Sequence, residues 1–386
     1  MPMTIETIGL VAGALVTAFL VALITTPIVK SLAQKWGAVD VPKDNRRMHD
    51  HPIPRMGGLA IFLGFLFSVI VFIRFIQPDG MTRPLQGMLL GAVIIVILGI
   101  FDDIYALPAM PKLLVQIAAA GIAVWSGNVI EVISNPNIFS SNPYWELGWL
   151  SVPFTVIWIV AVTNAVNLID GLDGLACGVS TISSMTLLVI ALIVSEPDVA
   201  ILMAALAGGC IGFLPYNLNP AKIFMGDTGS TFLGFILATV SIQGLFKFHM
   251  IISFAVPFLM LGLPIFDTCF AILRRVAKGQ SPMSPDRGHI HHRLIDMGFS
   301  QKQAVATLYL ISAILGLSAV VLTTSGTEKA MLFLMALCLA GAVAAKLYLS
   351  HNNGNGSSGK EAPKEPSKTQ IAGNDNFFGE EDRSDK

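Results

Sequence analysis

Four groups of acidic residues could carry chemistry in this chain, because each lies in or beside an apolar stretch. They are the adjacent pair Asp102 and Asp103, the segment 167–173, Asp227, and Asp267. Charge is costly near lipid, so a carboxylate there is usually paired, faces a wet cavity or belongs to a site. Several carboxylates at the ends of apolar spans therefore predict one polar chamber.

The pair Asp102 and Asp103 and the single Asp227 are candidates for metal and phosphate chemistry. Adjacent carboxylates repel each other unless a cation neutralises them, and Mg²⁺ favours one or two carboxylates plus substrate phosphate. Asp227 follows Gly226 at a predicted helix start, where free N–H groups favour phosphate. The structural alternatives are a solvated helix end for the pair and a helix N-cap for Asp227.

The segment 164–174 places two Asn and two Asp beside an apolar span. Asn167 and Asp170 are three residues apart and would share a helix face, while Gly171 and Gly174 allow the backbone to turn. A carboxylate and an amide can read a nucleobase edge or a sugar hydroxyl. The alternative is a turn between two helices built from Asx and Gly residues.

Three of the seven histidines, His289, His291 and His292, fall in one basic loop between Arg287 and Arg293. Imidazole and guanidinium groups at this spacing suit an anionic or hydroxyl-rich ligand. A zinc site is disfavoured, since neither cysteine nor a nearby set of carboxylates completes a tetrahedron.

Three further features allow more than one interpretation. Lys112 follows Asp103 closely and could contact phosphate or extend to the membrane surface. Asp267 lies inside an apolar span, where pairing with a basic partner is the default. The basic segment 40–58 ends in a glycine pair and would be attracted to anionic lipid headgroups whatever the activity of the protein.

The elements that position these residues are predicted to be membrane-spanning helices. The chain of 386 residues is 54% hydrophobic and 13% charged, whereas soluble domains have about 25% charged residues. Lipid satisfies no backbone group, so apolar runs of about 17–25 residues must cross as helices. We predict an all-α, polytopic bundle of about eleven spans at 5–29, 57–76, 85–101, 112–130, 150–169, 176–194, 199–215, 229–246, 250–272, 304–323 and 329–349.

The loops between these spans predict an orientation. One set of loops holds most of the Lys and Arg residues, and such loops face the cytoplasm. With eleven spans, the N-terminus lies outside, and all four acidic groups lie on the cytoplasmic side. Residues 1–349 would form the transmembrane catalytic domain, and the polar segment 350–386 a disordered cytoplasmic tail.

Other classes of protein fit less well. The four cysteines have no paired spacing that predicts a disulfide framework or a thiolate metal site. The net charge of −1 gives no basic footprint, and no nucleic-acid partner is predicted. A secondary transporter would place carboxylates near the membrane midplane on inverted repeats, whereas these lie at span ends and no repeat is apparent.

Taken in order, the motifs Phe-Asp-Asp, Asn-Leu-Ile-Asp-Gly-Leu-Asp-Gly, Phe-Met-Gly-Asp-Thr-Gly-Ser and His-Ile-His-His-Arg resemble those of the polyprenyl-phosphate N-acetylhexosamine-1-phosphate transferase superfamily, glycosyltransferase family 4. The chain looks most like the bacterial undecaprenyl-phosphate N-acetylglucosamine-1-phosphate transferases that initiate teichoic acid, O-antigen or related wall polymers. The sibling peptidoglycan branch, which uses UDP-N-acetylmuramoyl-pentapeptide, is the alternative. That branch usually carries a Lys where this chain has Tyr105-Ala106.

The resemblance implies transfer of N-acetylglucosamine 1-phosphate from its UDP derivative to undecaprenyl phosphate, with release of UMP. It also implies Mg²⁺, with Mn²⁺ as a substitute, and a multi-pass protein of the bacterial plasma membrane whose active site faces the cytoplasm. The oligomeric state stays open, with a homodimer among the alternatives.

The resemblance also assigns roles to individual residues. Asp227 is the leading metal ligand, joined by Asp102, and Asp102, Asp103 and Lys112 lie beside the reacting phosphates. The implied substrate-binding residues are Asn167, Asp170 and Asp173 for the nucleotide, and His289, His291, His292 and Arg293 for the sugar or its phosphate.

Overall fold

Long apolar helices make up most of the structure, as expected for a backbone that must satisfy its own hydrogen bonds in lipid. The computed structural model describes residues 4–42, 51–134, 144–245, 255–280 and 288–325. These residues all belong to one unit, Met1–Leu334. The predicted span 329–349 and the predicted tail 350–386 lie outside the described residues.

Twelve helices and two short two-stranded ribbons occur in this described part of the chain. The helices are α1 Ile5–Trp36, α2 Gly58–Phe72, α3 Arg83–Tyr105, α4 Ala109–Trp125, α5 Ser151–Leu168, α6 Leu175–Val194, α7 Pro197–Asn217, α8 Gly226–Leu245, α9 Ala255–Met260, α10 Gly262–Ala277, α11 Ile290–Asp296 and α12 Gln301–Ser325, with 3-10 turns η1 Ile73–Phe75 and η2 Gly148–Leu150. The strands are β1 Val39–Asp40, β2 Ile53–Pro54, β3 Val132–Ser134 and β4 Tyr144–Glu146.

Seven of these helices are long and apolar enough to cross a membrane. They are α1, α2 with η1, α3, α5 with η2, α6, α7 and α12. A polytopic helical membrane protein is therefore confirmed, while the count of eleven spans and the outside N-terminus stay predictions. The predicted spans 112–130 and 229–246 correspond to helices α4 and α8. The predicted span 250–272 is interrupted, because α9 ends at Met260 and α10 begins at Gly262.

Helix α8 lies at the centre of this unit, where it packs against α3, α5, α2 and α6. Phe232, Phe235 and Ile236 of α8 are fully buried, as expected for a helix that is apolar on every side and surrounded by others. Phe62 and Phe65 of α2 meet Phe232 edge-to-face, with ring centroids 5.4 and 5.5 Å apart. The bundle thus holds the first turn of α8 at a defined place.

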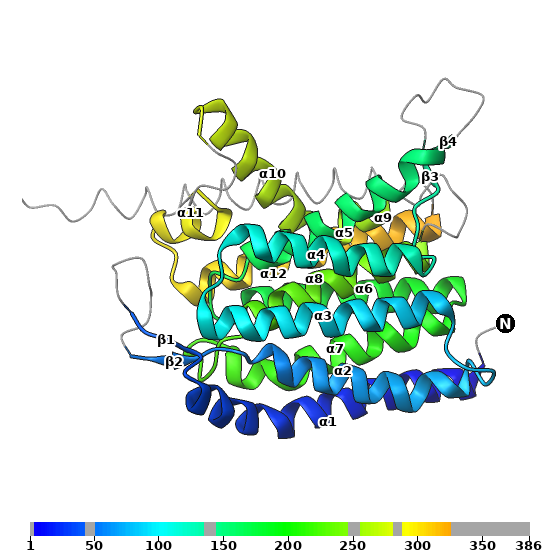
Figure 1. Ribbon diagram of the computed structural model, residues 1–386, viewed down its shortest axis with the longest axis horizontal. Coiled ribbons are helices and arrows are strands. Elements are labelled where there is room, and N and C mark those ends of the chain that lie inside the picture. The colour runs from blue at the N-terminus through cyan, green and yellow to red at the C-terminus, as the bar shows by residue number, and fades with distance from the viewer. Residues whose placement is uncertain (1–3, 43–50, 135–143, 246–254, 281–287, 326–386) are drawn as a thin grey trace, which may run out of the picture. The chain divides into compact units, whose positions relative to one another are not determined.

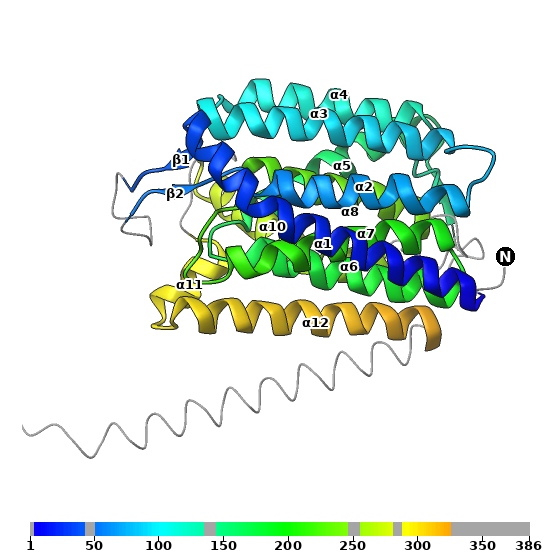
Figure 2. The same cartoon turned by 90° about the horizontal axis from the view of Figure 1, so that it is seen from below.

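Both ribbon views show the helices lying side by side, with the β1–β2 ribbon and α11 at one end of the bundle (Figures 1 and 2). In the ribbon, Val39 pairs with Pro54 and Asp40 with Ile53 in antiparallel register. Apart from Val39, these strands lie in the basic segment 40–58, for which the sequence predicts no strand. The backbone of residues 54–58 continues alongside the loop before α8, through bonds from Phe224 N to Pro54 O and from Gly57 N to Phe224 O.

Gly58, the first residue of α2, permits the closest approach in this region. Its N–H donates to the carbonyl oxygen of Met225 at 2.9 Å, and a Cβ added at Gly58 would overlap the backbone of Gly229 in the first turn of α8. Only hydrogen at this position lets α2 and α8 meet.

We therefore expect Gly58→Ala to lower the apparent melting temperature of the detergent-purified protein by several degrees, because backbone atoms must move to accept the methyl group. Gly121→Ala is the matched control, since a Cβ at Gly121 would meet nothing within 4 Å and alanine favours a helix. Equal melting temperatures for Gly58→Ala and wild type would contradict this account.

Candidate active site

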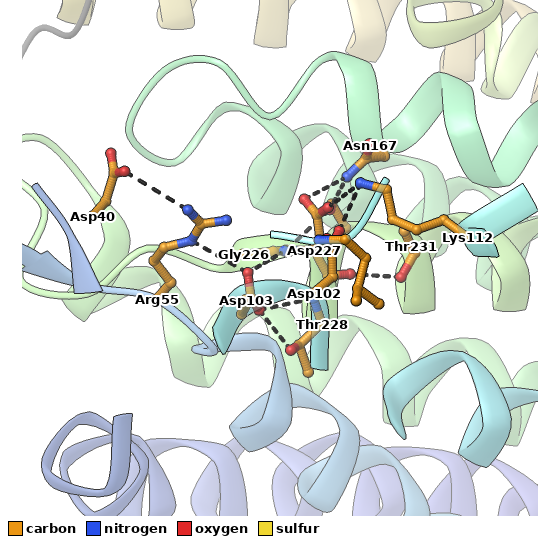
Figure 3. A network of polar contacts seen from close by, with 12 residues as sticks. Asp40, Arg55, Asp102, Asp103, Lys112, Asn167, Gly226, Asp227, Thr228 and Thr231 are labelled. Carbon is orange, nitrogen blue, oxygen red and sulfur yellow. Dashed lines mark hydrogen bonds and ion pairs between the residues drawn. The ribbon is translucent and has the colours of Figure 1, made fainter. Parts of the chain in front are cut away.

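Five of the predicted site residues come together where four helices end or begin (Figure 3). Asp102 and Asp103 lie in the last turn of α3, Lys112 in the first turn of α4, Asn167 at the end of α5, and Asp227 in the first turn of α8. Helix termini carry unpaired backbone groups and partial charges, so they suit charged side chains and ligands. Three of the acidic residues predicted to gather at span ends, Asp102, Asp103 and Asp227, therefore do lie together in this part of the chain.

Asp103 is buried and holds the start of α8. Its Oδ1 accepts from Asp227 N at 3.0 Å, and its Oδ2 accepts from Thr228 N at 3.1 Å and Thr228 Oγ1 at 2.6 Å. A Cβ at Gly226, whose φ is 73°, would overlap this carboxylate. Asp103 thus satisfies orphan N–H groups of α8, and its contacts favour a positioning role over direct participation in a reaction.

Asp102 and Asp227 face the same ammonium group. Lys112 Nζ donates to Asp102 Oδ2 at 2.7 Å and to Asp227 Oδ2 at 3.2 Å. Asp102 Oδ1 accepts from Leu107 N at 2.7 Å, and Asp227 Oδ1 accepts from Asn167 Nδ2 at 3.0 Å. The Asp102 side chain is only 4% exposed whereas that of Asp227 is 27% exposed, so Asp227 is the carboxylate that a ligand reaches.

The donor set around Lys112 fits a divalent cation of the magnesium type. No group of three or more His, Cys, Asp or Glu side chains suited to a metal occurs within the described residues, which disfavours an all-protein cage. Mg²⁺ instead uses one or two carboxylates and takes its other ligands from water and phosphate. Lys112 Nζ contacts both Asp102 and Asp227, so these two carboxylates share one cationic partner.

Asp170 and Asp173, which the sequence groups together, differ in their partners. Asp173 Oδ2 accepts from Asn219 Nδ2 at 2.9 Å and from Ala221 N at 3.0 Å, so it anchors the loop between α7 and α8. The carboxylate of Asp170 has no hydrogen bond or ion pair to the described part of the chain. Burial and the negative charges of Asp227, Asp103 and Asp173 raise the pKa of Asp170 to about 8.

The histidine motif reaches this site through His291. A Cβ at Gly171 would overlap the imidazole of His291, so the two are in close contact beside Asp170. Burial, followed by the charge of His292, lowers the pKa of His291 to about 4, and the ring is neutral at pH 7. His291 packs between its neighbours, with ring centroids 5.7 Å from His289 and 4.3 Å from His292.

Asp267 pairs with a basic partner, as its position inside an apolar span predicts, and that partner belongs to the histidine motif. Its Oδ2 lies 2.9 Å from His289 Nδ1, and its Oδ1 accepts from Ile290 N at 2.8 Å. All these partners are in α11 or directly before it, so Asp267 ties α10 to the histidine motif. The contact fixes the orientation of the His289 ring, as a carboxylate commonly does for a functional imidazole.

Two arginines differ from the sequence prediction, since Arg293 makes fewer contacts than expected and Arg55 makes more. Arg293 is exposed, and its side chain forms no hydrogen bond or ion pair within the described residues. Arg55 was assigned to lipid attraction, yet its Nε donates to Asp103 Oδ1 at 3.4 Å. The glycine pair Gly57-Gly58, which follows Met56, is the signal in the sequence, because it marks a close approach of two backbones.

Fold and site together define a polytopic membrane protein with a carboxylate-rich centre at the ends of its helices. A family model described as glycosyl transferase family 4 matches residues 85–245. A Bacillus subtilis (strain 168) protein named "Probable undecaprenyl-phosphate N-acetylglucosaminyl 1-phosphate transferase" is 45% identical over 315 residues, which cover 81% of this chain and 86% of the relative. The chain therefore belongs to glycosyl transferase family 4, as its motifs predict.

Two further relatives extend this comparison. The decaprenyl-phosphate N-acetylglucosaminephosphotransferase of Mycolicibacterium smegmatis is 33% identical, over 78% of this chain and 80% of the relative. The undecaprenyl-phosphate alpha-N-acetylglucosaminyl 1-phosphate transferase of Escherichia coli K12 is 31% identical, over 79% of this chain and 82% of the relative. The names of all three relatives specify an N-acetylglucosamine phosphate and a polyprenyl phosphate.

The environment of Asp170 predicts a cost in stability that depends on pH. Because the folded state raises the pKa of Asp170 to about 8, it binds this proton more tightly than the unfolded chain. Stability is then lost as the pH rises from about 4 towards 8. Asp170→Asn removes this loss, so the metal-free variant should be more stable than wild type, by on the order of 2 kcal/mol at pH 8 and less at pH 5.

Thermal melts of both proteins from pH 5 to pH 8, in a metal chelator, measure this difference. Asp173→Asn is the matched control, because the same change is made three residues away on a carboxylate that is already hydrogen-bonded. Superimposable melts of Asp170→Asn and wild type at every pH would refute the account of Asp170.

Proposed function

We propose that this protein transfers N-acetylglucosamine 1-phosphate from UDP-N-acetylglucosamine to undecaprenyl phosphate, releasing UMP. The product, undecaprenyl-diphosphate-linked N-acetylglucosamine, is the first lipid-linked intermediate of a cell-wall polymer. The observation that carries this proposal is the meeting of Asp102, Lys112 and Asp227 at the helix ends in a chain of this family. The names of the relatives favour N-acetylglucosamine over the muramoyl-pentapeptide alternative.

Asp227 and Asp102 are the residues proposed to hold Mg²⁺, or Mn²⁺ in its place. A bound divalent cation would neutralise charge on the phosphate groups that the reaction brings together. Asn167 keeps Asp227 in position, since its Nδ2 donates to Asp227 Oδ1 at 3.0 Å and to Ser230 Oγ at 2.8 Å. Lys112 adds a fixed positive charge at the same place.

The nucleotide and the sugar are proposed to bind beside this centre. Asp170, whose carboxylate has no hydrogen-bond partner within the described residues, contacts the nucleotide, whereas Asn167 and Asp173 hold the surrounding backbone and side chains in place. His289, oriented by Asp267, contacts the sugar or its phosphate. The partly buried His292 and the exposed Arg293 complete that side, and the neutral His291 supports the loop.

We favour direct transfer over a covalent enzyme intermediate. An oxygen of the undecaprenyl phosphate attacks the sugar-linked phosphorus, and the bond to the bridging oxygen breaks, so that UMP leaves with the bond electrons. The acceptor phosphate has its second pKa near 6 and is mostly a dianion at pH 7, so it needs little help from a base. Asp102 and Asp103 are both engaged by hydrogen bonds, which makes either a poor nucleophile.

The site is proposed to face the cytoplasm of a bacterial cell, with the protein in the plasma membrane. The basic residues near the site, including Arg55 and Lys112, support this orientation through the excess of Lys and Arg in cytoplasmic loops. UDP-linked sugars would then reach the site from the cytoplasm, and the undecaprenyl chain would remain in the bilayer.

An assay of UMP release tests the proposed function. Purified protein with Mg²⁺ and undecaprenyl phosphate should release UMP from UDP-N-acetylglucosamine and much less from UDP-N-acetylgalactosamine or UDP-N-acetylmuramoyl-pentapeptide. Asp227→Asn should reduce the rate about 100-fold or more, as loss of a key electrostatic group does, and remain extractable as folded protein. Release only from the muramoyl nucleotide would assign the chain to the peptidoglycan branch.

Isotope exchange distinguishes direct transfer from a covalent intermediate. A covalent enzyme would catalyse exchange of labelled UMP into UDP-N-acetylglucosamine in the absence of undecaprenyl phosphate. Direct transfer requires the acceptor, so we expect no exchange above that of Asp227→Asn. Exchange at a rate comparable to turnover would overturn the direct mechanism.

A further inference from the structure

Arg55 is placed at the carboxylate cluster by backbone contacts on both sides. Its own N–H donates to the carbonyl oxygen of Ala38 at 2.8 Å, and the neighbouring Pro54 accepts from Phe224 N at 2.8 Å. Gly57 and Gly58 then donate to the carbonyl oxygens of Phe224 and Met225 at 2.9 Å. The segment with Arg55 is thus tied to the loop that leads into Asp227.

The residue after Arg55 adds a second constraint. Met56 is fully buried and has φ of 82°, a left-handed conformation that side chains other than glycine rarely adopt. Such strained residues persist where the surrounding structure holds them, and they cluster at ligand-binding sites. The backbone therefore fixes the direction from which the Arg55 side chain leaves the chain.

The guanidinium group of Arg55 keeps donors available. Its Nε lies 3.4 Å from Asp103 Oδ1 and its Nη1 lies 3.7 Å from Asp40 Oδ1 (Figure 3). Both contacts are long for charge-assisted hydrogen bonds, and Nη2 makes none to the described part of the chain. The side chain is 27% exposed, so a ligand can reach it.

The negative charge of the carboxylates and of the phosphates favours a positively charged side chain at the site. Arg55 and Lys112 are the two cationic side chains in contact with the carboxylate cluster within the described residues, and Arg55 also stabilises the charged form of Asp170. The proposed substrates bring further negative charge. A planar guanidinium with free donors is well suited to phosphate. The carboxylates of Asp102, Asp103 and Asp227 meet at this place.

From this geometry we infer that Arg55 is a phosphate-binding residue of the active site. Its Nη donors bind a phosphate oxygen of an incoming substrate while its Nε stays on Asp103. The inference rests on the proposed function and deepens it. Two phosphates share this chemistry, the monophosphate of the polyprenyl acceptor and the diphosphate of the nucleotide sugar, and the experiment below distinguishes them.

The test compares steady-state kinetics of UMP release for purified wild type, Arg55→Gln and Arg55→Lys, with each substrate varied in turn. Arg55→Gln should lower kcat/KM for one substrate about 10- to 100-fold, mainly through KM, as expected for loss of a charged hydrogen bond. Arg55→Lys should lose less, because the charge remains. The substrate whose KM rises identifies the phosphate that Arg55 binds.

Two variants serve as controls. Lys35→Gln removes one positive charge from the exposed last turn of α1 and should leave both KM values unchanged. Asp40→Asn weakens the outer contact of Arg55 while its guanidinium remains, so it should leave both KM values within about twofold of wild type. If Arg55 served only as a structural link to Asp40, Asp40→Asn would instead change the KM values as Arg55→Gln does.

Three results would overturn the role of Arg55: KM values of Arg55→Gln within twofold of wild type, a loss confined to kcat, or a loss that Asp40→Asn reproduces. If Arg55→Gln is not recovered as folded protein, Arg55→Lys decides, since a raised KM for one substrate supports the inference and two wild-type KM values reject it. Wild-type turnover alone tests the proposed function, so its failure is distinguishable from failure of the Arg55 inference.

Discussion

The site depends on one buried carboxylate at the junction of two helices. Asp103, in the last turn of α3, accepts hydrogen bonds from the first N–H groups of α8 and from the Thr228 hydroxyl. A negative charge at a helix N-terminus is stabilising, so this contact fixes the end of one span against the start of another. Asp102 and Asp227 then both contact the ammonium group of Lys112. The adjacent aspartates therefore have separate tasks.

The same region is overcharged, because more carboxylates than cations meet there within the described residues. Such an arrangement costs stability in the free protein, and natural proteins commonly accept that cost at functional sites. The partners differ from one carboxylate to the next: Asp103 and Asp173 are engaged by backbone and side-chain donors, whereas Asp170 is not hydrogen-bonded within the described residues. The carboxylates that accept several hydrogen bonds hold the backbone of the site in place. We propose that those with fewer hydrogen bonds contact the metal ion or a substrate.

Much of the fold and the site can be predicted from the sequence, for definite physical reasons. Lipid forces apolar runs to be helical, so the helices around Asp102, Asn167 and Asp227 follow from composition and length. The interruption at Leu261, the β1–β2 ribbon and the contact between Arg55 and Asp103 do not. They arise from pairing between segments distant in sequence, for which a single sequence contains no periodic signal.

The sequence by itself determined the class of protein, its family and the residue types of its centre, because hydrophobic length and local motifs are encoded along the chain. Only the tertiary structure decided how those residues divide their roles. It distinguished the capping Asp103 from Asp102, and the anchored Asp173 from Asp170, and it joined Asp267 to His289. Hydrogen-bond partners are set by the three-dimensional meeting of helix ends, and the spacing of residues along the chain does not specify which oxygen meets which donor.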